Sequence, residues 1–167
     1  MSAPVVNVVV AGLGGQGVIK ASDILAEAAF RAGFDVKKAE VHGMSQRGGS
    51  VTSDVRFGGH VLSPMVPPGE ADCVVVLAED QVDVARVHLR PGGTLITPAD
   101  VDPESLPHQR SLNVALLGVL SRHLPQIDPE MWLGAIRANL AEKLHHLNEQ
   151  AFELGRNVPP TGRPPAD

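Results

Sequence analysis

The arrangement of this chain follows from residues 5–18, which read VVNVVVAGLGGQGV. The run from Val5 to Ala11 is rich in β-branched residues and nearly free of polar ones, which is typical of a central strand covered on both faces. The glycines after it interrupt the strand, and apolar residues then recur at helical spacing from Val18 until Gly33 ends the helix. A strand, a glycine loop and a helix in this order indicate the start of a βαβ unit.

Further strands are predicted downstream of this helix. Within residues 51–57, apolar residues alternate with polar ones, so one face is expected in the core and the other, with Asp54 and Arg56, in water. Gly58-Gly59 indicates a hairpin turn into a short return strand at residues 60–62. The remaining strands are expected at 35–40, 73–78 and 94–96, the last after a turn at Pro91-Gly92-Gly93.

Helices are expected to fill most of the second half of the chain. A short helix is predicted over residues 80–88, with Asp80 as its cap. Apolar residues within 112–124 repeat at helical spacing and predict an amphipathic helix. Asp128-Pro129-Glu130 has the features of a helix start, and the apolar stripe that follows continues to Leu154, as one long helix or two adjoining ones.

Together these elements predict a single α/β domain with a Rossmann-like, mostly parallel sheet and flanking helices. The chain of 167 residues is long enough to form one core without disulfides or metals. The domain is expected to cover residues 1–156, and the proline-rich residues 157–167 are expected to form a disordered tail.

Composition excludes several classes of function. A net charge of −5 and an aromatic content of 3% disfavour nucleic-acid binding, which needs cationic and stacking surfaces. The chain has a single cysteine, Cys73, which excludes an internal disulfide. One thiolate also cannot hold an iron–sulfur cluster or a structural zinc ion by itself. The apolar residues around Cys73 favour a small core residue over a redox thiol. With no leader-like N-terminus and no apolar run of about 18 residues, a cytoplasmic protein without a membrane segment is expected.

The first candidate site is the glycine loop. Gly12, Gly14 and Gly17 fit the G-x-G-x-x-G spacing between a strand and a helix, where loop amides and the helix N-terminus attract a phosphate. A dinucleotide site would also need an acid near the end of the second strand. Glu40 lies at about the right distance, although two lysines precede it and a polar loop follows. The alternative is that these glycines serve only the tight turn.

The second candidate site is the polar, glycine-rich stretch EVHGMSQRGGSV, residues 40–51. Its glycines allow close backbone approach to an anion, and the Arg47 guanidinium is suited to paired hydrogen bonds with a phosphate or carboxylate. His42 as a general base lacks a visible partner carboxylate, so the alternatives are that it contacts a ligand or only orders its own loop.

No other motif predicts catalysis or metal binding. His145 and His146 are adjacent, so on a helix their side chains point about 100° apart and cannot readily share an ion. No serine or cysteine lies in a nucleophile elbow, and no carboxylate pair has a spacing that indicates acid–base work. The sequence therefore predicts a protein without a self-contained active site.

Taken together, residues 12–18, 40–51 and 54–58 resemble the gamma subunit or domain of 2-oxoacid:ferredoxin oxidoreductases. Within that family the motif HGMSQRGGS, residues 42–50, is most similar to the small (beta) subunit of indolepyruvate:ferredoxin oxidoreductase. Asn113 and residues 148–155 fit the same family, so that the resemblance extends over nearly everything from Val8 to Gly155.

The resemblance implies a supporting role in an oxidoreductase complex. Enzymes of this family oxidatively decarboxylate a 2-oxoacid on thiamine diphosphate, pass electrons through iron–sulfur clusters to ferredoxin, and release an acyl-coenzyme A. Thiamine diphosphate and the clusters are expected on a large partner subunit, while the gamma domain helps to form the coenzyme A site and docks the thiamine-binding subunit. No catalytic or metal-binding residue is expected here. The expected cofactor-binding residues are Gly12, Gly14, Gly15, Gln16, Gly17, His42, Ser45, Gln46 and Arg47.

Two other functions are compatible with the residues. One is a stand-alone nucleotide- or flavin-binding oxidoreductase, which the glycine fingerprint would serve. The other is an orphan scaffold or regulatory protein that has the fold without the enzyme. Binding of nicotinamide or flavin nucleotides by the lone chain, and recovery of a thiamine-binding partner from the native cell, discriminate between these possibilities.

Overall fold

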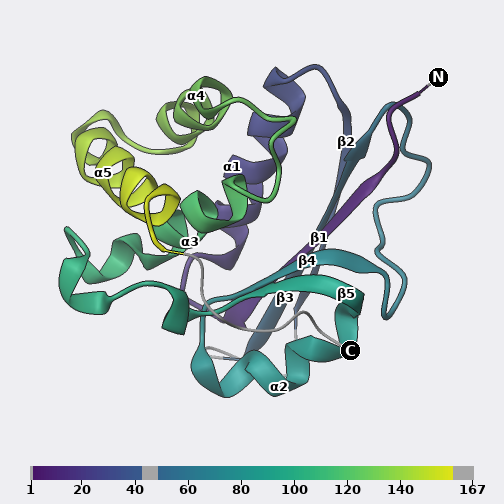
Figure 1. Cartoon of the computed structure of the whole chain (residues 1–167), viewed down its shortest axis with the longest axis horizontal. Coiled ribbons are helices and arrows are strands. Elements are labelled where there is room, and N and C mark those ends of the chain that lie inside the picture. Colours follow the sequence, from purple (N-terminus) through teal and green to yellow (C-terminus); the bar gives the residue numbers. More distant parts are fainter. Residues whose placement is uncertain (1, 43–48, 160–167) are drawn as a thin grey trace.

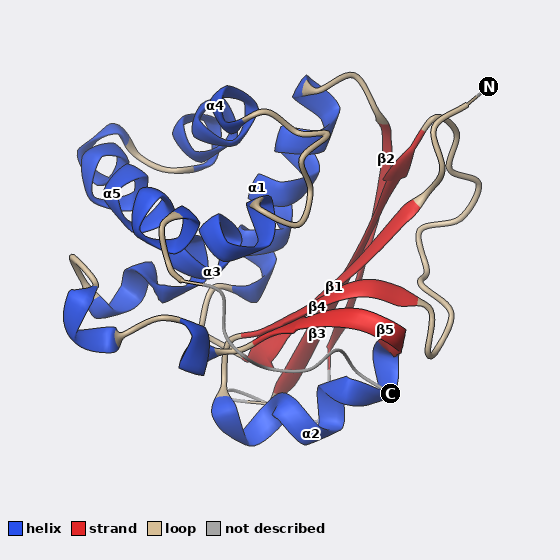
Figure 2. Ribbon diagram, viewed as in Figure 1, coloured by secondary structure: helices blue, strands red, loops and turns tan. Residues whose placement is uncertain are grey.

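A mixed, five-stranded sheet forms the centre of the protein. The computed structural model describes residues 2–42 and 49–159. Within them the strands follow the order β2-β3-β1-β4-β5 across the sheet, as Figures 1 and 2 show. Their bounds are Val6–Leu13 for β1, Asp35–His42 for β2, Ser50–Gly58 for β3, Ala71–Val76 for β4 and Leu89–Ile96 for β5.

The strand directions confirm the predicted α/β class, with one reversed strand. β1 pairs in parallel with β4, and β4 pairs in parallel with β5. β3 is antiparallel to both of its neighbours, β1 and β2, so β2 points in the same direction as β1 although β3 lies between them. The helix that follows β1 therefore carries the chain past the place of β3 to the edge of the sheet. The predicted βαβ unit is present, but split by a later strand.

Four helices cover one face of the sheet, and short helical turns cover the other (Figures 1 and 2). The first face carries α1 (Val18–Arg31), α3 (Leu112–Ser121), α4 (Pro129–Asn139) and α5 (His145–Arg156). The opposite face carries α2 (Val82–Ala85), which two 3₁₀ turns flank at Glu79–Gln81 and Arg86–His88. Further 3₁₀ turns lie at Pro98–Asp100, Pro103–Ser105, Gln109–Ser111 and Glu142–Leu144.

Two apolar clusters sandwich β1, as its sequence predicts. Successive side chains of a strand point to opposite faces, so Val8 and Val10 join the large cluster under the four helices. Val9 and Ala11 join a smaller cluster under α2. All four are buried, which explains why this strand has almost no polar residue.

Helix α3 corrects the prediction of an amphipathic helix. Every residue from Asn113 to Ser121 is buried, because α5 and the sheet enclose α3 and Val101 closes the same cluster. A helix that is apolar on every side is typical of a buried position.

The predicted helix beyond Pro129 is two helices rather than one, since Leu140 and Ala141 adopt extended backbone conformations between α4 and α5. Asp128 is the N-cap of α4 and Pro129 its first residue, as expected.

The region after β3 differs from the prediction. Residues 60–62 form no strand; instead the Val61 amide donates to the Asp35 carboxylate at 2.7 Å, and the chain continues as a loop. That loop folds back over the sheet, where the Val66 amide donates to Asp54 Oδ2 at 2.9 Å. Asp54 is therefore buried, not in water, and burial raises the pKa of its carboxyl group.

Two smaller predictions also need correction. Asp80 lies inside a 3₁₀ turn whose N-cap is Ala78, and no side chain caps that turn. Pro91-Gly92-Gly93 belongs to β5, where the pairing with β4 shifts register between Ala71 and Cys73. The left-handed Gly92, with φ of 77°, absorbs the extra residues as an irregularity inside the strand.

Candidate functional site

The glycine loop lies at the carboxyl end of the central strand β1. Gly12 is still part of the strand and pairs with Val51 of β3. Gly14, Gly15 and Gln16 form an exposed turn, and Gly17 is the N-cap of α1. The carboxyl ends of the strands in an open α/β sheet are where such folds bind their ligands.

Three glycines of this loop, Gly12, Gly15 and Gly17, have separate physical reasons for being glycine. A Cβ on Gly12 would lie 2.9 Å from both Gln16 Oε1 and Val18 Cγ2, and a Cβ on Gly17 would lie 2.5 Å from Asn113 Nδ2. Gly15 has open space around it, but its φ of 89° is left-handed. Gly12 and Gly17 are thus fully explained by packing and the turn, whereas Gly15 keeps its backbone open to a ligand.

Hydrogen bonds inside the loop hold it in shape. The Leu13 amide donates to Gln16 Oε1 at 2.7 Å, and the Gln16 amide donates back to the Leu13 carbonyl at 3.2 Å. The oxygen of the Gln16 side chain is therefore used within the loop, which leaves the NH₂ group of this exposed residue as the donor for a ligand.

The start of α1 is suited to an anion. An α-helix leaves the amides of its first turn without intrahelical partners and carries a partial positive charge there. No acidic residue occupies the first turn of α1, and Gly17 offers no side chain to cap it. An external anion can therefore take the place of the missing cap.

The second candidate stretch begins and ends beside the glycine loop. His42 ends β2 opposite Val51, and Ser50 begins β3 opposite Leu13. The Gly14 amide donates to the Gly49 carbonyl at 2.9 Å, which joins the two segments directly. Ser45, Gln46 and Arg47 lie outside the described residues. The two motifs, some thirty positions apart in the sequence, thus share one edge of the sheet.

Asn113 is a neighbour of the glycine loop whose contact the sequence does not reveal. Its Nδ2 donates to the Gly17 carbonyl at 3.2 Å across the interface between α3 and α1. The only local signal is a polar residue at the second position of an otherwise strongly apolar helix.

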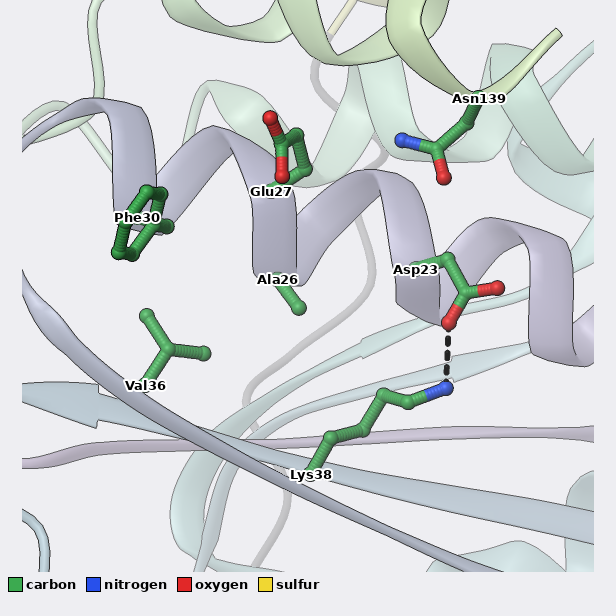
Figure 3. Close-up of a pocket in the computed structure, with 7 residues that line it drawn as sticks. All are labelled: Asp23, Ala26, Glu27, Phe30, Val36, Lys38 and Asn139. Atoms are coloured by element: carbon green, nitrogen blue, oxygen red, sulfur yellow. Dashed lines mark hydrogen bonds and ion pairs between the residues drawn. The ribbon is translucent and has the colours of Figure 1, made fainter.

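Glu40 does not have the surroundings of a ribose-binding acid. Lys38 Nζ lies 2.5 Å from the Glu40 carboxylate and 2.5 Å from that of Asp23 on α1. Burial lowers the pKa of Lys38, but the hydrogen bonds with the two carboxylates outweigh that effect, so the pKa lies above its ordinary value. Figure 3 shows Lys38 reaching from β2 toward Asp23, at one side of an open groove of about 360 Å³ between α1 and β2.

The described residues show no catalytic thiol or metal centre. Cys73 is buried, and burial raises the pKa of its thiol to about 12. No group of three or more metal-ligating side chains occurs within 2–42 and 49–159. His145 contacts the Leu140 carbonyl at 2.8 Å through Nε2, while His146 is exposed. In the same part of the chain, no helix has the length and apolar character needed to cross a bilayer.

Comparison with known proteins places the chain among oxidoreductase subunits. The family described as pyruvate ferredoxin/flavodoxin oxidoreductase matches residues 7–158. Indolepyruvate oxidoreductase subunit IorB of Thermococcus kodakarensis is 43% identical over 154 residues, which are 91% of this chain and 70% of that protein. The Pyrococcus horikoshii subunit IorB is 42% identical over 83% of this chain and 66% of its own length. The chain thus spans about two thirds of the length of these relatives.

Solved structures show the same fold. The gamma subunit of a keto/oxoacid ferredoxin oxidoreductase from Geobacter sulfurreducens superimposes with a TM-score of 0.78 at 21% identity, covering 93% of this chain and 97% of that one. A 2-oxoglutarate:ferredoxin oxidoreductase from Magnetococcus marinus, solved with 2-oxoglutarate, coenzyme A and succinyl-CoA bound, also gives 0.78 at 21% identity, over 92% of this chain and 31% of that one. With a family match over nearly all of the described domain, this chain belongs to the pyruvate ferredoxin/flavodoxin oxidoreductase family.

Proposed function

We propose that this protein is the non-catalytic small subunit of a cytoplasmic indolepyruvate-type 2-oxoacid:ferredoxin oxidoreductase, and that it helps to hold coenzyme A. The observation that carries the proposal is the meeting of two loops at the carboxyl edge of the sheet, which the Gly14–Gly49 hydrogen bond joins. The identity of 43% with an indolepyruvate oxidoreductase subunit over 91% of the chain supports indolepyruvate or another aryl 2-oxoacid as the substrate of the whole complex.

The chemistry of this edge fits the anionic part of coenzyme A. The free first-turn amides of α1 and the exposed backbone of Gly15 are donors for a phosphate oxygen. Gln16 adds a side-chain NH₂ donor. From the neighbouring stretch we assign His42, Ser45, Gln46 and Arg47 to the same ligand, with the Arg47 guanidinium as the main counter-charge. In this proposal, none of these groups breaks or forms a covalent bond.

The remaining chemistry is assigned to a large partner subunit. A four-cysteine iron–sulfur site cannot be built from one cysteine, and Cys73 lies inside β4 and the core. We therefore assign the clusters that deliver electrons to ferredoxin to that partner, and with them thiamine diphosphate. When bound there, thiamine diphosphate supplies the carbanion chemistry of decarboxylation. The small subunit contributes binding and orientation of the acyl acceptor.

A stand-alone dinucleotide enzyme fits the site less well. In such enzymes an acid at the end of the second strand binds the ribose hydroxyls. Here Lys38 holds Glu40 in an ion pair that also includes Asp23. Submicromolar binding of NAD(H), NADP(H) or a flavin by the lone chain would contradict our proposal. An orphan scaffold is the conclusion to draw if pulldown from the native cell recovers no thiamine-binding partner.

The assay that tests the proposal uses the assembled complex with Arg47→Ala. Loss of a guanidinium–phosphate contact is expected to raise the KM for coenzyme A about ten- to hundredfold, because charged hydrogen bonds contribute about 1.5–3 kcal/mol. The KM for the 2-oxoacid is expected to stay within about twofold.

The matched control is Arg31→Ala, at the opposite end of α1, where the arginine makes an exposed contact with Glu27 at 3.0 Å. It should leave the KM for coenzyme A unchanged, since exposed pairs of this kind contribute little. Equal rises in both Michaelis constants for Arg47→Ala would argue against a coenzyme A contact.

A further inference from the structure

The N-terminal end of α3 meets the glycine loop at one polar contact. Asn113 is the second residue of α3 and only 8% exposed. Its Nδ2 donates to the Gly17 carbonyl at 3.2 Å, across 96 positions of sequence. The same carbonyl accepts the first helical hydrogen bond of α1, from the Ala21 amide at 2.9 Å. Two donors thus converge on the peptide group that joins the loop to the helix.

The orientation of the Asn113 amide follows from its partners. Gly17 presents a carbonyl oxygen, which can only accept, so the nitrogen of the Asn113 side chain must face it. The other end of that side chain, Oδ1, accepts the Val114 amide at 2.9 Å. Both ends of the amide are therefore occupied, and the side chain has one favourable arrangement.

The same side chain also limits the conformation of Gly17. Gly17 has a φ of 84°, and a Cβ at this position would lie 2.5 Å from Asn113 Nδ2. Left-handed backbone is accessible to glycine, but nothing in glycine itself selects it over other conformations. The Asn113 hydrogen bond adds to the Ala21 bond in restraining the Gly17 carbonyl, because rotation of that peptide group would break both.

We propose that Asn113 is a positioning residue for the anion site, which holds the Gly17 peptide so that the exposed loop and the first turn of α1 face the ligand. This inference rests on the proposed coenzyme A function, since it names the residue that orders the same site. Asn113 does not touch the ligand in this scheme. It acts through Gly17, and α3, in which every residue after Leu112 is buried, supports its position.

Asn148 provides a matched control within the same protein. It is also a buried asparagine, 7% exposed, and its Nδ2 donates to a backbone carbonyl, that of Leu144, at 2.9 Å. This bond is local to the start of α5. Asn113→Leu and Asn148→Leu therefore remove the same kind of donor from equally buried positions, and only the first change affects the glycine loop.

The first readout is hydrogen–deuterium exchange of residues 13–20 in the assembled complex without coenzyme A. Asn113→Leu is expected to speed exchange there roughly five- to tenfold, which corresponds to one lost hydrogen bond. Asn148→Leu should leave this segment unchanged. Unchanged exchange in Asn113→Leu, or the same increase in Asn148→Leu, overturns the positioning role.

A second variant covers the case in which Asn113→Leu does not fold. Asn113→Asp keeps the size of the side chain but sets a carboxylate oxygen against the Gly17 carbonyl at neutral pH. Protonation restores a donor, so the loop should regain protection as pH falls through the pKa of the introduced carboxyl group, above its usual value of about 4 because of burial. A purely structural lesion would not reverse in this way, and the absence of reversal overturns the proposal.

The kinetic readout separates this inference from the proposed function. In the assembled complex, Asn113→Leu is expected to raise the KM for coenzyme A about fivefold or more, with kcat and the KM for the 2-oxoacid little changed. Faster loop exchange with an unchanged KM for coenzyme A would overturn the proposed coenzyme A function, while the positioning of the loop by Asn113 would stand.

Discussion

At the scale of single residues, the glycines of the first loop differ in what they would tolerate. Gly15 and Gly17 both have left-handed backbone, with φ of 89° and 84°. Only Gly17 also has a neighbour in the place of a Cβ, the Asn113 amide at 2.5 Å. A pair of alanine substitutions therefore separates backbone strain from steric conflict.

Gly17→Ala is expected to destabilise the protein by about 2–4 kcal/mol, because left-handed strain of about 1–2 kcal/mol adds to the displacement of Asn113. Gly15→Ala should cost only the strain, about 1–2 kcal/mol. Urea unfolding followed by circular dichroism measures both free energies. Equal losses of unfolding free energy in the two variants would show that the Asn113 side chain moves away from the added methyl group without a measurable loss of stability.

The buried thiol gives a second residue-scale prediction, with a defined pH dependence. Burial raises the pKa of Cys73 from 9.0 to about 12, Asp72 adds to the rise, and Arg90 opposes it. The fold therefore favours the neutral thiol. The stabilisation from this preference is complete below about pH 9 and is lost as pH rises toward 12.

At pH 9 the native protein should react with a thiol reagent at least about a hundredfold more slowly than the urea-unfolded chain, because both thiolate formation and access are suppressed. The rate of absorbance change with an aromatic disulfide reagent is the measurement. A native rate close to the unfolded one would mean that β4 is open to solvent.

At the scale of elements, α3 and α5 cross with their backbones in close contact. A Cβ on Gly118 would lie 2.1 Å from the Phe152 carbonyl oxygen, and one on Gly155 would lie 1.9 Å from that of Ala115. Backbone oxygens cannot move aside as a flexible side chain can. The two glycines therefore set the distance between the helices, and so also the position of α3 beneath the glycine loop.

Gly155→Ala is expected to cost about 3 kcal/mol or more, since the helices must separate to admit the methyl group. Gly134→Ala, in α4, is the control, because its Cβ would meet the end of the Arg31 side chain at 2.9 Å, which can move. Higher helix propensity should make that change neutral or stabilising by up to about 1 kcal/mol. Thermal unfolding of both variants tests the difference, and similar melting temperatures would contradict the close crossing.

At the scale of the whole molecule, the fold is compatible with the proposed subunit, which would bind a ligand without catalysing the reaction. Four helices cover one face of the sheet (Figure 1). The two candidate stretches border the carboxyl end of β1, where His42 ends β2 opposite Val51 and Ser50 begins β3 opposite Leu13. We therefore expect no 2-oxoacid oxidation by the chain alone. Activity should appear on mixing with the large thiamine- and iron–sulfur-containing subunit and saturate at a fixed ratio of the two. Reduction of a ferredoxin or a viologen dye is the measurement, and turnover by the isolated chain would overturn the assignment of catalysis to the partner.

Local patterns were enough to predict the elements that depend on near neighbours in the chain. The strand–glycine loop–helix unit is present with α1 starting at Val18, and Asp128 and Pro129 begin α4 as expected. Capping, β-branching and glycine conformation act within a few residues, so they can be recognised in a single sequence. Errors arose where distant segments decided burial: Asp54 lies under a returning loop, and α3 is enclosed on every side.

By itself, the sequence determined the α/β class and the buried central strand. It also located two candidate anion-binding motifs, whose residues indicated membership of this oxidoreductase family. Only the tertiary structure decided that β3 lies reversed between β1 and β2, that the two motifs share one edge of the sheet, and that Asn113 holds Gly17. The physical reason is that strand order and the contact between α3 and the glycine loop depend on residues that lie tens of positions apart in the sequence. Periodicity and local propensity describe only near neighbours, so they do not predict such contacts.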